Sequence, residues 1–261
     1  MIDSTAAQVQ LRCCDYLELL RELPNESVDL IITDPPFGVC YQNPYTSEKK
    51  AVLLGDASPF SYSDLGKECF RVLKSGCAAF WFTGWSTYPQ HFVEVGNSGF
   101  QMKEPVICQK RPSRSTDLYG SFQSNSNWIM FGVKGRFTFR QSELVKNKSA
   151  GRVPNKGRKP VPEFKTRFPS CWFGDEFPYS SIHPAEASKN GWTHPTIKNA
   201  VFVEWLIRLC TDPGALILDC FAGSGTTAVS AYQAGRRFIG CELDPKYFEE
   251  AQRRLTVLGV A

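Results

Sequence analysis

The sequence has no segment typical of a membrane-spanning or exported protein. It contains no run of about 18 consecutive apolar residues, and its first residues, MIDSTAAQVQ, lack a basic start followed by an apolar stretch. A low-complexity repeat is also missing. We therefore expect a soluble, cytoplasmic protein with no membrane partner.

The sequence also lacks Cys-x-x-Cys pairs, although it contains ten cysteines. Such pairs are typical of zinc and redox sites, and disulfide frameworks are typical of small secreted domains. The cysteines are scattered through apolar segments, and Cys13 and Cys14 are adjacent. We interpret them as reduced packing residues and expect no metal site.

The composition is that of an ordinary globular protein, with 42% hydrophobic and 21% charged residues in 261. The net charge of +4 is unevenly distributed, because Lys134 to Arg167 holds eleven Lys or Arg against two acids and so carries +9. The remainder carries −5. The basic stretch is either a face that binds a polyanion or a solvated loop.

Hydrophobic periodicity predicts alternating strands and helices at both ends of the chain. The first segments, 8–14, 15–23 and 28–33, suggest a strand, a helix and a strand, hence a parallel sheet. A helix is predicted over 61–76, with Ser63 as its N-cap and Gly76 beyond its end. Further strands are expected over 77–85, 103–110, 127–135, 215–220 and 237–243, and further helices over 200–210, 226–235 and 245–255.

From about 111 to 184 this pattern gives way to segments rich in Pro, Gly, Ser and basic residues. We therefore divide the chain into a cofactor-binding catalytic domain, residues 1–110 and 186–261, and a basic insertion, residues 111–185. The insertion is our candidate for target recognition, with these aromatic residues near the bases or in a local core: Tyr119, Phe122, Phe164, Trp172 and Phe173.

A glycine turn lies near the C-terminus, in ALILDCFAGSGTTAVSAYQAG. Gly223 and Gly225 permit a tight turn and close approach of a ligand at a helix N-terminus, and Glu242 ends the next predicted strand, where a carboxylate suits ribose hydroxyls. A packing turn, NAD or FAD binding and another adenosine cofactor all fit this pattern. Only one strand and one helix follow, so any remaining units must come from earlier in the chain.

The segment TDPPF places a carboxylate, two prolines and an aromatic ring at the end of the buried strand 28–33. Pro35 and Pro36 lack N–H groups and fix the backbone, so the Asp34 carboxylate and the Pro35 carbonyl form a rigid pair of acceptors beside Phe37. Such a group suits a planar ring that bears an NH₂ group. A simple Asp-Pro turn is the alternative.

These residues resemble a known family. DPPF is similar to the catalytic motif of the DNA amino-methyltransferases, which methylate adenine N6 or cytosine N4, and DCFAGSGTT resembles their S-adenosylmethionine motif. The order of the two motifs resembles that of the permuted, or beta, class. The resemblance implies a doubly wound, mostly parallel, seven-stranded Rossmann-like α/β sheet in permuted order, with S-adenosyl-L-methionine as cofactor and double-stranded DNA as partner.

The resemblance also implies roles for individual residues. The catalytic residues would be Asp34, Pro35, Pro36 and Phe37. Asp15 would accept a hydrogen bond from the cofactor's adenine amine, Glu242 would bind its ribose, and Thr196 and Lys198, in THPTIKN, would lie near its methionine part. The full cofactor set is Asp15, Asp34, Thr196, Lys198, Asp219, Phe221, Gly223, Ser224, Gly225, Thr226 and Glu242.

The predicted activity is site-specific methylation of adenine N6 in DNA, because the family links an Asp at the first motif position mainly to adenine. The alternatives are methylation of cytosine N4 in DNA or of adenine N6 in RNA, a catalytically silent nucleic-acid-binding subunit, and a dinucleotide-dependent oxidoreductase. The protein is expected to be a monomer or a homodimer, with a cognate restriction endonuclease as a further partner.

Overall fold

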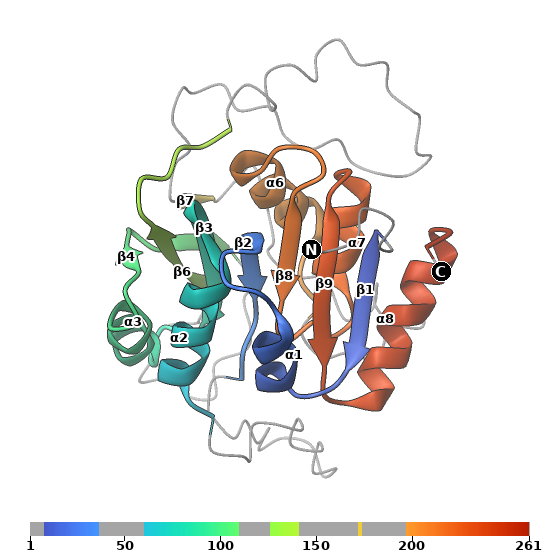
Figure 1. Ribbon diagram of the computed structural model, residues 1–261, viewed down its shortest axis with the longest axis horizontal. Helices are drawn as coiled ribbons and strands as arrows, with labels where there is room; N and C mark the ends of the chain where they lie inside the picture. The colour runs from blue at the N-terminus through green and yellow to red at the C-terminus, as the bar shows by residue number, and fades with distance from the viewer. Residues whose placement is uncertain (1–7, 37–59, 110–125, 141–171, 174–196, 261) are drawn as a thin grey trace, which may run out of the picture.

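The computed structural model describes residues 8–36, 60–109, 126–140, 172–173 and 197–260. These residues form one sheet covered by helices on both faces (Figure 1). The elements in chain order are β1 Val9–Cys13, α1 Tyr16–Glu22, β2 Val28–Thr33, α2 Tyr62–Val72, β3 Leu73–Thr83, α3 Tyr88–Gly96, β4 Gln101–Met102, β5 Val106–Gln109, β6 Ser126–Lys134, β7 Trp172–Phe173, α6 Ala200–Cys210, β8 Leu216–Asp219, α7 Thr226–Gln233, β9 Arg237–Glu242 and α8 Pro245–Val257.

The sheet of the described residues has the order β1-β9-β8-β2-β3-β6-β5-β7, with β4 paired to β6. The pairs from β1 to β3 are all parallel, whereas β6 runs antiparallel to both β3 and β5. Two of the nine strands, β4 and β7, have only two residues each. The remaining seven strands confirm the predicted mostly parallel sheet.

The two ends of the chain interleave in this sheet. β8 pairs with β2, with Leu30 opposite Ile217, and β9 pairs with β1. The glycine turn and the segment after β2 are therefore on neighbouring strands, as the permuted order requires. Within 111–185, β6 and β7 also join the sheet; the division into a domain and an insertion stays a prediction.

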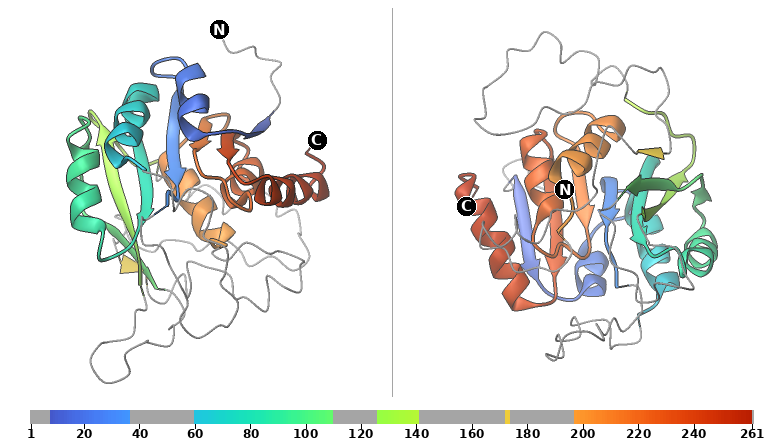
Figure 2. Two further views of the ribbon diagram at one scale, coloured as in Figure 1. Left: turned by 90° about the horizontal axis from the view of Figure 1, so that it is seen from below. Right: turned by 180° about the vertical axis from the view of Figure 1, so that it is seen from behind.

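Alternation along the strands builds two cores. Ile31 faces the helices α1, α2 and α3, whereas Leu30 and Ile32 face α6, α7 and α8. Figures 1 and 2 show the two helical layers on opposite faces of the sheet. Such burial of both faces explains why the consecutive residues Leu30, Ile31 and Ile32 of β2 are all apolar instead of alternating with polar ones.

The connections reverse direction between β2 and β8. β8 continues through α7, on one face, to β9, whereas β2 leads to β3 through α2, which lies on the other face. In open sheets of this kind, ligands bind in the crevice at the carboxyl ends of the strands where the order reverses. The fold therefore places a site just beyond Thr33 and Asp219.

Three details differ from the sequence analysis. Ser61, not Ser63, caps α2, since its Oγ accepts a hydrogen bond from Asp64 N at 3.1 Å. The helix ends at Val72, and Gly76 lies in β3, at φ +79°, where the register with β2 shifts. The third is α3, which was not predicted, because its apolar residues are few and it begins with Tyr-Pro.

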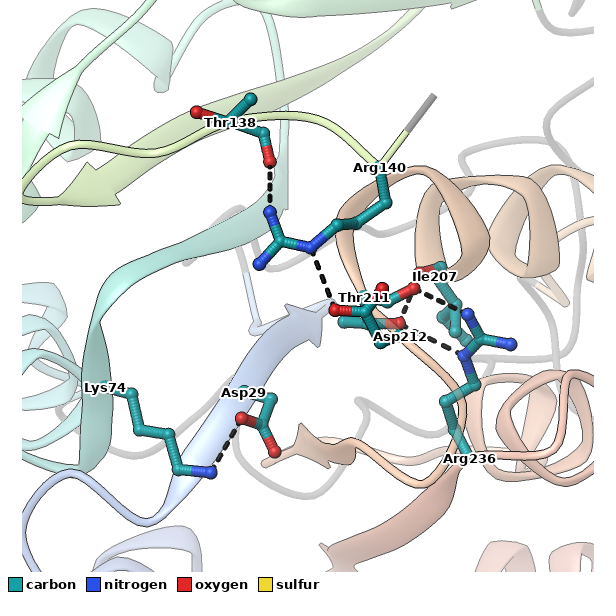
Figure 3. A network of polar contacts seen from close by, with 8 residues as sticks. All are labelled: Asp29, Lys74, Thr138, Arg140, Ile207, Thr211, Asp212 and Arg236. Atoms are coloured by element: carbon teal, nitrogen blue, oxygen red, sulfur yellow. Dashed lines mark hydrogen bonds and ion pairs between the residues drawn. The ribbon is translucent and has the colours of Figure 1, made fainter. Parts of the chain in front are cut away.

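The chain enters the basic stretch at the amino end of the sheet. After β6, Arg140 Nε lies 3.0 Å from an oxygen of Asp212, in the loop before β8 (Figure 3). At the same edge, Lys74 of β3 pairs with Asp29 of β2 at 2.7 Å. Because these parallel strands begin here, this edge is opposite to the one that carries Asp34.

Among the helices in the described part of the chain, none combines the length and the apolar character that a membrane crossing requires. The eight described cysteines are all free thiols, and five of them are buried. Burial raises the pKa of the Cys241 thiol. The five buried cysteines are packing residues, as expected, whereas Cys13 is exposed.

Candidate active site

The crevice between β2 and β8 brings the two predicted motifs together. A small cavity there, of about 30 Å³, is lined by residues of both motifs and of the segment before α6. The polar residues among them are Thr33, Asp34, Lys198, Asp219, Ser224, Thr226 and Thr227. Residues from both ends of the chain thus line the same cavity.

Asp34 lies directly past the end of β2, with its side chain 23% exposed. Its Oδ2 forms an ion pair with Lys198 Nζ. Its Oδ1 is buried and has no hydrogen-bond partner among the described residues. The following Pro35 is itself buried, so the backbone at this point is fixed. Asp34 therefore lines the cavity and keeps one acceptor oxygen that no described residue uses.

Lys198 is held from two sides. Its ammonium pairs with Asp34 and lies 4.8 Å from the centroid of the Phe82 ring, at the end of β3. The sequence analysis expected Lys198 near the cofactor's methionine part. The structure adds the contact with Asp34, which no local sequence signal indicated, because the two residues are 164 positions apart.

Thr33 links the ends of β2 and β8. Its hydroxyl donates to Asp219 Oδ1 at 2.9 Å and accepts from Cys220 N at 3.2 Å. Asp219 is only 4% exposed. Burial raises the pKa of Asp219 to about 6. Hydrogen bonds from Thr227, Phe221 and Thr33 lower this pKa, and the charge of Asp34 raises it.

The glycine turn has the left-handed conformation that its composition predicted. Gly223 has φ +52° and Gly225 has φ +78°, and Gly225 is the N-cap of α7. Glu242 fixes the turn, because its Oε2 accepts from Gly223 N at 2.8 Å and its Oε1 accepts from Asp244 N at 2.9 Å. Burial raises the pKa of Glu242.

Arg254 supports the turn from α8 and was not predicted. Its guanidinium donates to the Ser224 carbonyl at 2.6 Å, to the Ser224 hydroxyl at 2.9 Å and to the Thr226 hydroxyl at 3.3 Å. Burial lowers its pKa to about 10. In the sequence this arginine is one of several charges on an amphipathic helix, so nothing distinguished it.

Asp15 lies between the end of β1 and the start of α1, and β1 pairs with β9. Its Oδ1 accepts from Leu17 N at 2.8 Å, which makes it the N-cap of α1. Beside it, Tyr16, Phe60 and Phe221 form an aromatic cluster, with ring centroids 5.1 to 5.5 Å apart. Only Phe221 was among the predicted site residues; this cluster is an apolar wall next to the glycine turn.

Some predicted residues lie outside the described part of the chain. They are Phe37, Thr196, Tyr119, Phe122 and Phe164, and for Trp172 and Phe173 only the backbone strand is described. Their roles stay predictions. Among the described residues, no group of three or more His, Cys, Asp or Glu has an arrangement that could hold a metal ion.

A glycine turn at a helix N-terminus and the Asp34 carboxylate both lie at the reversal point of one doubly wound sheet, the place where open α/β folds bind their ligands. The family model for N6/N4 methylases, described as DNA methylase, matches residues 28–253. The chain therefore belongs to the N6/N4 DNA methylase family. The predicted class, a DNA amino-methyltransferase that uses S-adenosylmethionine, is confirmed.

Three named proteins with similar sequences support this assignment. The chain is 27% identical over 244 residues to the putative methylase YubD of Escherichia coli (strain K12), covering 94% of this chain and 88% of YubD. It is 27% identical over 266 residues to the type II methyltransferase M1.MboII of Moraxella bovis, covering 96% of each. The DNA adenine methyltransferase YhdJ of Escherichia coli (strain K12) is 26% identical over 253 residues, covering 93% of this chain and 81% of YhdJ.

Solved structures share the fold. The M1.HpyAVI complex with S-adenosylmethionine matches with a TM-score of 0.60 at 20% identity, covering 95% of this chain and 100% of that one. The cytosine-N4-specific PvuII DNA methyltransferase matches with a TM-score of 0.65 at 18% identity, covering 96% and 89%. At these identities the comparison shows the architecture and leaves the target base open.

Proposed function

We propose that this protein transfers the methyl group of S-adenosylmethionine to the N6 amine of adenine in double-stranded DNA. The observation that carries the proposal is the buried Asp34 Oδ1 at the reversal point of the sheet, which has no hydrogen-bond partner in the described part of the chain. Asp at this first motif position is linked in the family mainly to adenine. Among the relatives, one is named a DNA adenine methyltransferase and one structure is cytosine-N4-specific, so the base is the part of the proposal that needs testing.

The proposed mechanism depends on positioning. The cofactor supplies a sulfonium methyl group as the electrophile. The Asp34 carboxylate and the Pro35 carbonyl accept the two N–H groups of the target amine and direct its lone pair toward that methyl. The new N–C bond would form as the S–C bond of the bound cofactor breaks with the thioether as leaving group, and the proton released by the methylated amine would pass to solvent. Positioning of this kind can remove roughly 7 to 11 kcal/mol of an activation barrier.

The described residues fit the cofactor. The left-handed turn at Gly223 and Gly225 opens α7 toward the crevice, and a helix N-terminus with small residues permits close approach of a ligand. The aromatic cluster of Tyr16, Phe60 and Phe221 suits a flat adenine ring. Lys198 is the cation nearest to Asp34, and we assign it to the methionine carboxylate as well.

The target base is tested by expression in a bacterial host that lacks DNA methylation, followed by single-molecule sequencing of the genome. We expect N6-methyladenine at one short recurring sequence. N4-methylcytosine at a recurring sequence would refute adenine as the target. Digestion of the modified DNA with endonucleases specific for that sequence then tests the proposal that a restriction enzyme is the cognate partner.

Asp34→Ala tests the catalytic role. We expect a loss of methyl transfer of at least about 100-fold, the scale of removing one polar contact to the reacting group, with S-adenosylmethionine affinity retained in calorimetry. Asp64→Ala, which removes an Asp that is 55% exposed on α2, is the matched control and should keep full activity. Normal turnover by Asp34→Ala would contradict the assignment.

A further inference from the structure

Among the described residues, Trp85 is the one large aromatic side chain that is exposed. Trp85 is 68% exposed, whereas the tryptophans Trp81 and Trp205 are at most 1% exposed. Exposing an indole to water forgoes the stabilisation that its burial would contribute. Trp85 plays no part in the core, so its position requires another explanation.

The register of the sheet places Trp85 at the catalytic edge. β3 runs parallel to β2 with Trp81 opposite Thr33, so Trp85 follows the strand end on the side where Asp34 follows β2. Trp85 lies three residues beyond the residue of β3 that is level with Asp34, so its Cα is at most roughly 11 Å further along the strand direction. The two neighbouring strands are about 4.8 Å apart.

The turn that carries Trp85 is held in place by hydrogen bonds on both sides of the residue. The Gly84 carbonyl accepts from Thr87 N at 3.2 Å and from Tyr88 N at 2.9 Å. The Thr83 hydroxyl lies 3.3 Å from the Thr87 hydroxyl and 2.9 Å from His91 Nδ1. The indole is therefore presented on a fixed support, which lowers the entropy lost when a ligand orders it.

The segment around Trp85 carries no formal charge and is rich in aromatic residues. The segment 84–93, GWSTYPQHFV, contains no acidic residue, so no carboxylate of this segment repels a phosphate. Tyr88 packs on Trp128, with ring centroids 5.3 Å apart. Trp128, on β6, is the strand partner of Thr83, on β3. Two further aromatic rings therefore lie on the elements next to the turn that carries Trp85.

We propose that Trp85 stacks on a DNA base next to the target nucleotide and holds the opened duplex at the site. The inference depends on the proposed DNA substrate but not on which base is methylated. Enzymes that modify a base must take it out of the stack, which leaves neighbouring bases unstacked. An aromatic side chain at that point replaces the lost stacking, and it does so with any sequence.

The test measures DNA and cofactor separately. Trp85→Ala should raise the KM for unmethylated genomic DNA by about 5- to 150-fold, the range known for loss of one base-aromatic stack, while kcat and the Kd for S-adenosylmethionine stay unchanged. Trp85→Phe should retain most of the DNA affinity. Val257→Ala, which removes another exposed apolar side chain (87% exposed) from α8, is the control and should change neither constant.

A second measurement is independent of turnover. Fluorescence anisotropy of a labelled duplex should show the same loss of affinity for Trp85→Ala, with an unchanged molar mass by light scattering. Unaltered DNA binding by Trp85→Ala, an equal loss of cofactor affinity, or a loss explained by a change in oligomeric state would each overturn the proposal. A product of N4-methylcytosine would refute only the target base, so the two failures are distinguishable.

Discussion

Two carboxyl groups at the floor of the crevice have different environments and different roles. Asp34 is partly exposed and keeps one oxygen free toward the cavity, whereas Asp219 is buried and uses its oxygens within the fold. The hydroxyl of Thr33 connects the ends of their strands. We infer that Asp34 acts on the substrate and that Asp219 keeps the two motifs aligned.

At the residue scale, Asp219 makes stability depend on pH. Its pKa is raised by burial from 3.8 to about 6, so between these values the folded state binds a proton that the unfolded state has released. The contribution of Asp219 to the free energy of unfolding therefore decreases as the pH rises toward 6. A shift of about two pKa units corresponds to about 3 kcal/mol. Asp219→Asn cannot ionise. Its free energy of unfolding, measured by urea denaturation, should therefore increase relative to that of the wild type by up to about 3 kcal/mol between pH 4 and pH 7.5.

The difference between variant and wild type removes the contribution of all other titrating groups. Identical pH dependence of the two proteins would show that Asp219 does not titrate in this range. Asp212→Asn, at an exposed position next to Arg140, is the control and should follow the wild type.

At the scale of elements, the turn between β8 and α7 is constrained by its neighbours on both sides. Glu242 at the end of β9 holds the Gly223 amide, and Arg254 of α8 holds Ser224. The Ala222 amide also donates to the Cys241 carbonyl at 2.8 Å. The cofactor turn is thus fixed by the strand and the helix that follow it, and its geometry requires all three elements to fold together.

Gly225→Ala should disturb this turn more than a comparable glycine elsewhere. The added Cβ would meet Ala251 Cβ at 2.9 Å, at a φ of +78°. The left-handed conformation costs roughly 1–2 kcal/mol for a residue with a Cβ, and overpacking adds about 1–3 kcal/mol. We expect a loss of about 2–5 kcal/mol in the free energy of unfolding and a weaker affinity for S-adenosylmethionine.

Gly235→Ala is the matched control, because Gly235 has φ +73° but no atom within 4 Å of the added Cβ. It should cost only the roughly 1–2 kcal/mol of the backbone conformation and leave cofactor affinity unchanged in calorimetry. Equal effects of both substitutions would refute the role of the contact with Ala251.

At the scale of the whole molecule, the catalytic edge and the start of the basic stretch are at opposite ends of the strands. Arg140 is anchored near the beginning of β8, whereas Lys198, at the far end of the undescribed segments, contacts Asp34. Between these two residues the chain must pass from one edge of the sheet to the other.

If the basic stretch binds phosphates, DNA affinity should fall steeply between low and moderate salt, with a slope of about −0.9 in log units for each phosphate neutralised. Lys156→Gln, Arg158→Gln and Lys159→Gln together should reduce the slope by up to about 2.7. The measurement is fluorescence anisotropy of a labelled duplex at a series of salt concentrations.

The control removes three positive charges from exposed positions on described helices: Arg21→Gln, Lys67→Gln and Arg253→Gln. This variant should keep the slope of the wild type. If both triple variants change the slope equally, the effect comes from net charge and the basic stretch has no special role.

The sequence by itself determined the class of fold, the order of the motifs and the family. Periodicity located β2, β8 and α7, because hydrophobic spacing and glycine turns are local properties, and the short motifs DPPF and GSG identified the chemistry. The remaining site residues carry no such local signal. The N-cap of α2 was missed because Ser61 and Ser63 satisfy the same capping rule.

Only the tertiary structure decided which side chains meet. The pair Lys198–Asp34, the bond from Thr33 to Asp219 and the support of Ser224 by Arg254 join residues 164, 186 and 30 positions apart. Such contacts depend on how strands from both ends of the chain pack into one sheet, and that packing is a property of the whole molecule.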